Sequence, residues 1–235
     1  MVFRNIVIFG DPSVDRRFIF KPLGIRSVTW NANIIPLLMI FETQIYSVTT
    51  SRNKYKVYDT AGLHSDVSSL EPRQVLGSLY RFISAFDGGI HLLVYAVDDK
   101  YSVNDVKIFY DFLCRRNVPI ILVTSNPHLP SMSRSVNNLP HFKDILILKG
   151  DNPENDRDRL QEALSTHIKR DPKEILPMNR FEMTIVKSWK LLERAAGWTI
   201  PQYRDAIMAT LIDEAFFSEQ GAAVRSQYMA DYIKK

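Results

Sequence analysis

Three short segments of the sequence contain residue types that can bind a phosphate or a metal ion. The first begins at Gly10, directly after the apolar run Asn5–Phe9, and reads GDPSVDRRF. A phosphate-binding loop has the form G-x-x-x-x-G-K-[ST] between a strand and a helix, because its backbone, lysine and hydroxyl bind phosphate oxygens and Mg²⁺. Only Gly10 fits this pattern. Asp15, Arg16 and Arg17 stand where the second glycine, the lysine and the hydroxyl residue belong, so this segment alone predicts a turn between a strand and a helix.

Two later segments also follow strand-like runs. Asp59-Thr60-Ala61-Gly62 matches D-x-x-G, which in G proteins binds magnesium and senses the γ-phosphate. Thr124-Ser125-Asn126-Pro127 ends a later apolar run, where G proteins position the segment that recognises guanine. Because ligands of open α/β sheets bind at the carboxyl ends of the strands, the three segments together predict one crevice.

Short apolar runs ended by turn residues predict the strands that position these segments. They are Asn5–Phe9, Ile90–Val97, Pro119–Val123 and Ile145–Leu148. Unbroken apolarity is typical of parallel strands covered by helices on both faces. Two alternating runs, Gln44–Thr50 and Lys54–Tyr58, predict a hairpin at the sheet edge. Apolar residues at helical spacing over 76–86 and 106–113 predict helices between these strands. This order of strands and helices along the chain predicts an α/β fold whose sheet is mostly parallel with one antiparallel edge strand.

Beyond about residue 170 the strand pattern stops and helical patterns follow. They predict a helix over Phe181–Ala196, a second helix with Thr199 as its N-cap, and a last helix over Ala222–Ile233. Two or three amphipathic helices are too few to form an independent domain. We therefore expect them to pack against the sheet domain or a partner. The predicted division is a sheet domain at 1–170 and a C-terminal helical extension at 171–235.

The composition excludes several classes of protein. A chain of 235 residues with 46% hydrophobic and 24% charged residues is close to the globular average, which excludes a disordered chain and a disulfide scaffold. Cys114 is the single cysteine, which favours a reducing, cytoplasmic setting. The longest apolar stretch, Ile34–Phe41, contains Pro36 and is far shorter than the roughly 20 residues of a transmembrane helix. The net charge of +4 is small and scattered, so we expect no nucleic-acid partner.

Several framework segments carry a resemblance to a known family. They are Tyr46–Thr49, Lys56–Leu63, Phe86–Tyr95, Phe109–Cys114 and Val118–Thr124. Through them the chain resembles the GIMAP-type (AIG-like) branch of the P-loop GTPases over roughly residues 3–170. The resemblance implies a three-layer P-loop NTPase (G-domain) fold, guanine nucleotide with Mg²⁺ as the ligand, and GTP hydrolysis as the usual reaction. Framework segments indicate fold more strongly than activity.

The residues that would bind the nucleotide depart from that family's pattern. Asp15 brings a carboxylate toward the phosphates, where two like charges 4 Å apart repel by about 4 kcal/mol at an effective dielectric near 20. Arg16 keeps the charge of the lysine but not its compact shape, and Arg17 offers no oxygen to Mg²⁺. In the first switch loop, Ile40 aligns with a magnesium-binding threonine. Pro127 replaces the acidic residue that accepts two hydrogen bonds from guanine.

These departures favour a pseudo-GTPase, in which guanine-nucleotide binding is weak or lost and the fold serves protein interaction. The apolar segment Trp30–Phe41 or the C-terminal helices would then contact the protein partner. The alternative is an active switch that binds and hydrolyses GTP, with Arg16 in the role of the lysine and Mg²⁺ held by Asp59 and water. Only in that case is GTP or GDP with Mg²⁺ a cofactor. A third hypothesis is an adenine-nucleotide or phosphate binder that uses the same crevice.

The residues that we predict at the crevice come from all three segments. They are Gly10, Asp15, Arg16, Arg17, Asp59, Gly62, Thr124 and Pro127, with Asp59 as the candidate metal ligand and no catalytic residue among them. Asp59 is equally compatible with capping the turn after its strand. Arg16 and Arg17 fit either an anion site at a helix N-terminus or two solvated cations. His64 lies where some G proteins place a water-positioning side chain.

Overall fold

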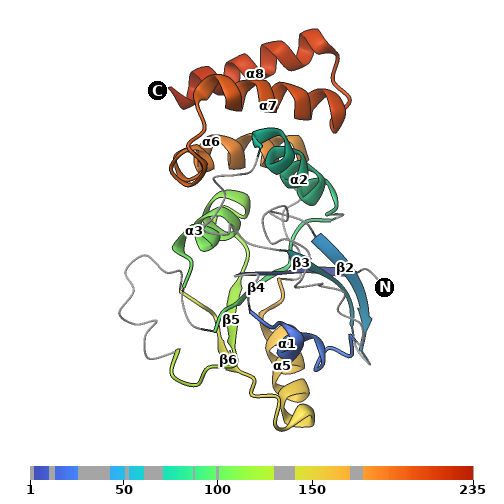
Figure 1. Cartoon of the computed structure of the whole chain (residues 1–235). Helices are drawn as coiled ribbons and strands as arrows, with labels where there is room; N and C mark the ends of the chain where they lie inside the picture. The colour runs from blue at the N-terminus through green and yellow to red at the C-terminus, as the bar shows by residue number, and fades with distance from the viewer. Residues whose placement is uncertain are drawn as a thin grey trace.

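A six-stranded sheet forms the centre of the molecule (Figure 1). The structure, a computed structural model, describes residues 3–10, 14–25, 43–50, 53–60, 71–86, 88–98, 101–129, 141–169 and 177–234. The strands are β1 (Arg4–Gly10), β2 (Thr43–Thr49), β3 (Lys54–Thr60), β4 (Leu92–Ala96), β5 (Ile120–Thr124) and β6 (Ile145–Ile147). Their order is β2-β3-β1-β4-β5-β6, and every neighbouring pair is parallel except β2 and β3. The predicted α/β class, with a mostly parallel sheet and one antiparallel edge strand, is confirmed.

Helices cover both faces of this sheet. They are α1 (Arg17–Phe20), α2 (Pro72–Ser84), α3 (Val103–Val106), η2 (Lys107–Leu113), α5 (Pro153–His167), α6 (Pro177–Ala196), α7 (Ile200–Asp213) and α8 (Glu219–Ile233). Helices α1 and α5 lie on one side, and α2, α3 and the C-terminal helices lie on the other (Figure 1). The helix predicted over 106–113 is mostly the π-helical turn η2, whose wider winding the apolar spacing did not indicate.

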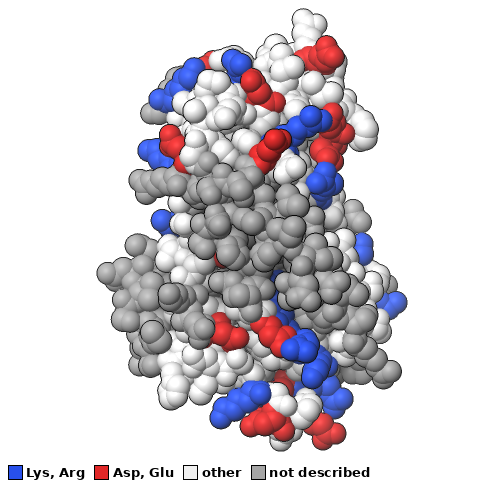
Figure 2. Space-filling model, in the orientation of Figure 1, with Lys and Arg blue, Asp and Glu red and all other residues white. Residues whose placement is uncertain are grey.

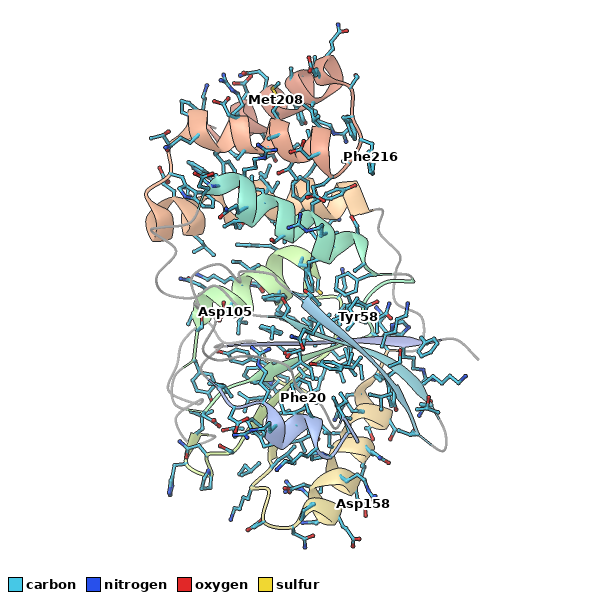
Figure 3. The ribbon with its side chains drawn as sticks, turned by 45° about the vertical axis from the view of Figure 1, so that its right-hand side comes forward. Phe20, Tyr58, Asp105, Asp158, Met208 and Phe216 are labelled. Carbon is cyan, nitrogen blue, oxygen red and sulfur yellow. The ribbon has the colours of Figure 1, made fainter. Side chains whose placement is uncertain are left out.

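Alternate side chains of the central strands enter two separate hydrophobic clusters. Ile6 and Ile8 of β1 join the cluster beneath α1 and α5, together with Phe20. Val7 of β1 joins the cluster beneath α2, together with Tyr58 of β3. Figure 3 shows Phe20 and Tyr58 on opposite sides of the sheet. Burial on both faces explains why these strands are apolar without interruption.

The three C-terminal helices pack on α2 and η2, the helices that cover one face of the sheet, and do not form a hydrophobic core of their own. Helices α6 and α7 contact α2, α6 also contacts η2, and α8 packs on α7 and α6. Phe181 of α6 meets the ring of Tyr80 edge-on, with 5.1 Å between the ring centroids. Thr199 is the N-cap of α7, as predicted, and forms a capping box with Gln202. These helices therefore share one hydrophobic cluster with a face of the sheet.

Charged side chains of both signs are interspersed on the surface. On the face shown in Figure 2, Lys and Arg lie next to Asp and Glu over the described C-terminal helices. Two ion pairs, Arg73 with Asp213 and Arg81 with Glu214, join α2 to the end of α7. None of the helices in the described ranges is long and apolar enough to cross a membrane.

Candidate functional site

The side chain of Arg16 ties the end of β1 to the end of β3. Its Nη1 donates to a carboxylate oxygen of Asp59 and to the carbonyl oxygen of Thr60, the latter at 2.9 Å. Its Nη2 donates to the carbonyl oxygen of Gly10 at 2.8 Å. The Asp59 side chain is fully buried, and that of Arg16 is 6% exposed. The guanidinium is thus directed into the protein, toward three oxygens on two neighbouring strands.

Of the two sequence-based interpretations of Arg16, this geometry contradicts the solvated cation. It is not a solvated cation, because it is buried. Nor does it point outward like a phosphate-binding lysine, because both Nη atoms donate to oxygens of the protein. Only Nε has no hydrogen-bond partner within the described ranges. Helix α1, at four residues, is also too short to offer a substantial N-terminal dipole to an anion.

Asp15 and Arg17 form a second ion pair, which lies at the surface. Arg17 Nε donates to both carboxylate oxygens of Asp15 at 2.8 Å, and the backbone N–H of Arg17 donates to Asp15 Oδ1 at 3.1 Å. The hydrogen bond from the Arg17 side chain lowers the pKa of the Asp15 carboxyl and raises the pKa of Arg17. Both side chains are more than half exposed, so the pair adds little stability.

Gly10 lies at a position in the sheet where only glycine fits, because of its backbone conformation and the closeness of the neighbouring strand β4. Its φ is +141°, a conformation that L side chains rarely adopt. It pairs with Ala96 of β4, and a Cβ on Gly10 would lie 2.0 Å from the Ala96 carbonyl oxygen. Close approach of two parallel strands therefore accounts for this glycine without any phosphate.

The segment after β5 is held by an aspartate that the sequence analysis missed. The Asp98 carboxylate accepts hydrogen bonds from the backbone N–H of Ser125 at 3.0 Å and from its hydroxyl at 2.6 Å. Asn126 Nδ2 donates to the Asp98 carbonyl oxygen at 3.0 Å. Thr124 is buried, and its hydroxyl oxygen accepts a hydrogen bond from the backbone N–H of Asn126. Pro127 is exposed. Asp98 follows β4, and its position after a buried strand was the signal that could have identified it.

The structure brings only some of the predicted residues together. Arg16 is in direct contact with both Gly10 and Asp59, and Thr124 lies at the end of β5 on the same edge of the sheet. The predictions that concern Gly62, His64, Ile40 and Trp30–Phe41 lie outside the described residues.

The described side chains do not fit the magnesium ion that the family resemblance implies. The candidate ligand Asp59 pairs with Arg16, so a cation already lies against its carboxylate. Arg17, at the position of the hydroxyl residue, provides no oxygen and pairs with Asp15. Within the described part of the chain, no group of three His, Cys, Asp or Glu residues could hold a metal ion.

Comparisons with known proteins give distant structural similarity. The chain is similar to an Era variant of Aquifex aeolicus bound to GDP·AlF4⁻, with 17% identity and a TM-score of 0.47 over 80% of this chain and 66% of that one. It is also similar to the cytosolic domain of Legionella pneumophila FeoB, with 10% identity and a TM-score of 0.42 over 98% of both chains. The cytosolic domain of Thermotoga maritima FeoB in a GDP form gives 11% identity and a TM-score of 0.39, over 100% of this chain and 96% of that one.

The chain thus spans about two thirds of the length of the Era chain. No protein-family model matches the sequence, and no curated protein sequence matches it. At these identities and TM-scores, the similarity does not indicate a ligand or an activity.

Proposed function

We propose that this chain is a pseudo-GTPase of the G-domain type, related to the GIMAP-like GTPases, which acts through protein interaction with guanine-nucleotide binding weak or lost. The observation that carries the proposal is the buried ion pair between Arg16 and Asp59. The side chains at the positions of the phosphate-binding lysine and the magnesium-side aspartate neutralise each other. Neither charge is then directed toward a ligand.

The segment after β5 supports the same proposal. Pro127 has no carboxylate, so two hydrogen bonds to guanine are lost at about 1.5–3 kcal/mol each. The polar groups of Ser125 and Asn126 instead bind Asp98. A loss of about 3–6 kcal/mol corresponds to a reduction of affinity by roughly two to four orders of magnitude.

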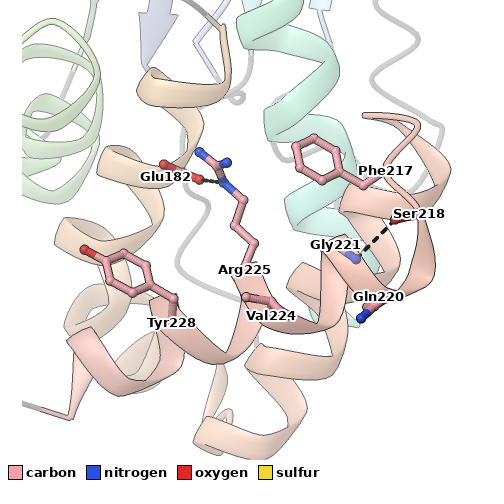
Figure 4. A pocket seen from close by; sticks show the side chains of 8 residues that line it. All are labelled: Glu182, Phe217, Ser218, Gln220, Gly221, Val224, Arg225 and Tyr228. Carbon is pink, nitrogen blue, oxygen red and sulfur yellow. Dashed lines mark hydrogen bonds and ion pairs between the residues drawn. The ribbon is translucent and has the colours of Figure 1, made fainter.

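The surface of the C-terminal helices supports the interaction role. Phe216, Val224, Tyr228 and Tyr232 are four of the five large hydrophobic residues that are exposed in the described ranges. The last three are spaced four residues apart and therefore follow one face of α8. Figure 4 shows Val224 and Tyr228 beside the ion pair of Arg225 and Glu182, along an open groove of about 710 Å³. Exposed aromatic residues of this kind are enriched at protein interfaces.

The nucleotide content of the purified protein tests the first half of the proposal. The full chain is purified without added nucleotide and extracted with acid, and the extract is analysed for GDP and GTP. We expect neither at a stoichiometric level. We also expect no change in melting temperature with GTP or GDP and Mg²⁺, whereas a ligand at 100 times its Kd would add about 2.7 kcal/mol, or roughly 5–11 °C for a chain of this size.

A reversion variant provides the matched control. It combines Asp15→Gly, Arg16→Lys, Arg17→Ser, Ile40→Thr and Pro127→Glu, and we expect it to bind guanine nucleotide measurably by calorimetry. One guanine nucleotide per wild-type chain would refute the proposal and favour the active switch. A folded reversion variant without binding would show that these positions are not the nucleotide-binding positions.

A further inference from the structure

A row of four residues, spaced three or four apart, follows one face of α8. They are Gly221, Val224, Tyr228 and Tyr232, and we call them the α8 stripe. Val224, Tyr228 and Tyr232 are 69%, 67% and 57% exposed. The open groove of about 710 Å³ runs beside this stripe, with Gly221 near one end and Tyr228 near the other (Figure 4).

The α8 stripe is small at one end and large at the other. Gly221 has no side chain, whereas the exposed rings of Tyr228 and Tyr232 lie about two and three turns further along the helix. A second α8 that runs in the opposite direction brings its tyrosines to the glycine end of the first and receives the tyrosines of the first at its own glycine end. The stripe is therefore complementary to a reversed copy of itself.

The charges at the two ends of α8 favour the same direction. Glu219 is the first residue of α8, Lys234 directly follows its last residue, and both are exposed. Between antiparallel copies, Glu219 of each copy lies near Lys234 of the other, whereas parallel copies would bring like charges together. Charge complementarity at the helix ends thus selects the antiparallel arrangement.

The pairing of Glu219 with Lys234 also decides which residues of the stripe meet. Residue numbers rise along one helix as they fall along the other, so Gly221 then lies opposite Tyr232 of the second copy. In this register the largest side chain of the stripe lies against the residue that has none.

Arg225 lies opposite Tyr228 of the second copy in the same register. Its guanidinium pairs with Glu182 and lies 5.7 Å from the ring centroid of Phe217, so it is already held beside the groove. A second aromatic ring on its free side adds a cation–π contact.

We propose that α8 is the contact surface of a homodimer, in which two α8 helices pair antiparallel about a two-fold axis. The inference rests on the proposed function, because it names a second copy of this chain as the protein that the C-terminal helices contact. A stable interface buries about 800 Å² on each partner, and three partly exposed side chains provide only part of that area. The dimer is therefore weak and forms reversibly with concentration.

Sedimentation equilibrium of the full chain, from micromolar to millimolar concentration, tests the proposal. Tyr228→Ser with Tyr232→Ser removes the two rings. Ile45→Ser is the matched control, because Ile45 is the remaining one of the five large hydrophobic residues exposed in the described ranges. Glu219→Lys and Lys234→Glu are measured singly and together, and circular dichroism checks that each variant is folded.

We expect the mean mass of the wild-type protein to rise with concentration from that of one chain toward that of two. The double tyrosine variant raises the Kd of the dimer at least about tenfold, because a few aromatic anchors carry most of the binding energy of an interface, and Ile45→Ser leaves the Kd unchanged. Each single charge reversal raises the Kd about two- to tenfold at low salt, and the combined reversal restores it, because opposite charges meet again.

Three results would overturn the inference. They are a wild-type chain that stays monomeric at millimolar concentration, a folded double tyrosine variant that dimerises as well as the wild type, and a combined charge reversal that dimerises no better than the single ones. A monomer without guanine nucleotide would end the homodimer and leave the proposed pseudo-GTPase standing. A dimer with one guanine nucleotide per chain would do the reverse, so the two proposals fail separately.

Discussion

Replacement of Gly10 by alanine separates a structural role of this glycine from a phosphate-binding role. The residue has a φ of +141° and pairs with Ala96 of β4. A Cβ at this position would lie 2.0 Å from the Ala96 carbonyl oxygen, whereas close C···O contacts in proteins are about 3.3–3.6 Å. The backbone must therefore shift by more than an ångström at a buried pair of strands.

The expected loss of stability follows from two contributions. The unfavourable φ costs about 1–3 kcal/mol, and overpacking in a well-packed interior costs about 1–3 kcal/mol more. A total of about 4 kcal/mol is a large part of the 5–15 kcal/mol by which domains are typically stable, and it would lower the melting temperature by roughly 8–16 °C.

Gly24→Ala is the matched control for this measurement. Gly24 also has a positive φ, +78°, but no atom lies within 4 Å of the position of its Cβ. We expect only the strain of the left-handed conformation, about 1–2 kcal/mol. Both variants are unfolded in urea without nucleotide. Equal losses in the two variants would refute the packing argument and leave the positive φ as the structural reason for Gly10.

Two further predictions concern the C-terminal helices. Burial raises the pKa of the Tyr203 hydroxyl above its usual value of 10.0. Above about pH 10, therefore, the unfolded chain releases this proton and the folded chain keeps it. The free energy of unfolding then falls by up to about 1.4 kcal/mol for each pH unit. Tyr203→Phe should make urea unfolding less steeply pH-dependent between about pH 10 and 11, and pH profiles as steep as that of the wild type would contradict this. The double variant Val224→Ser with Tyr228→Ser should change the free energy of unfolding by no more than about 0.5 kcal/mol, because both side chains are exposed. It should also abolish cross-linking to a protein partner, while the exposed control Gln227→Ala retains it. Equal cross-linking by the wild type, the double variant and the control would exclude this face of α8 as the contact surface.

Local patterns predicted most of the fold. The unbroken apolar runs became β1, β4, β5 and β6, because strands buried on both faces have no polar side to reveal. The N-cap at Thr199 was predictable because its hydrogen bonds are made within three residues. The π-helical turn η2 was not, because residues three and four apart also lie near one another in a wider helix.

The contacts of the candidate site were much less predictable. Arg16 and Asp59 are 43 residues apart, and nothing in the local sequence distinguishes Arg16 from the exposed Arg17 beside it. The link from Asp98 to Ser125 likewise joins the ends of two neighbouring strands. Side chains that meet across strand ends have no periodic pattern, so the sequence identified the edge of the sheet but not the pairs formed there.

The cation that joins the ends of β1 and β3 is a side chain of the protein itself, that of Arg16. A soluble ion leaves its site when it is diluted or chelated, but a side chain stays at a constant effective concentration near its acceptors. The link that Arg16 forms between the ends of β1 and β3 therefore does not require a soluble ion.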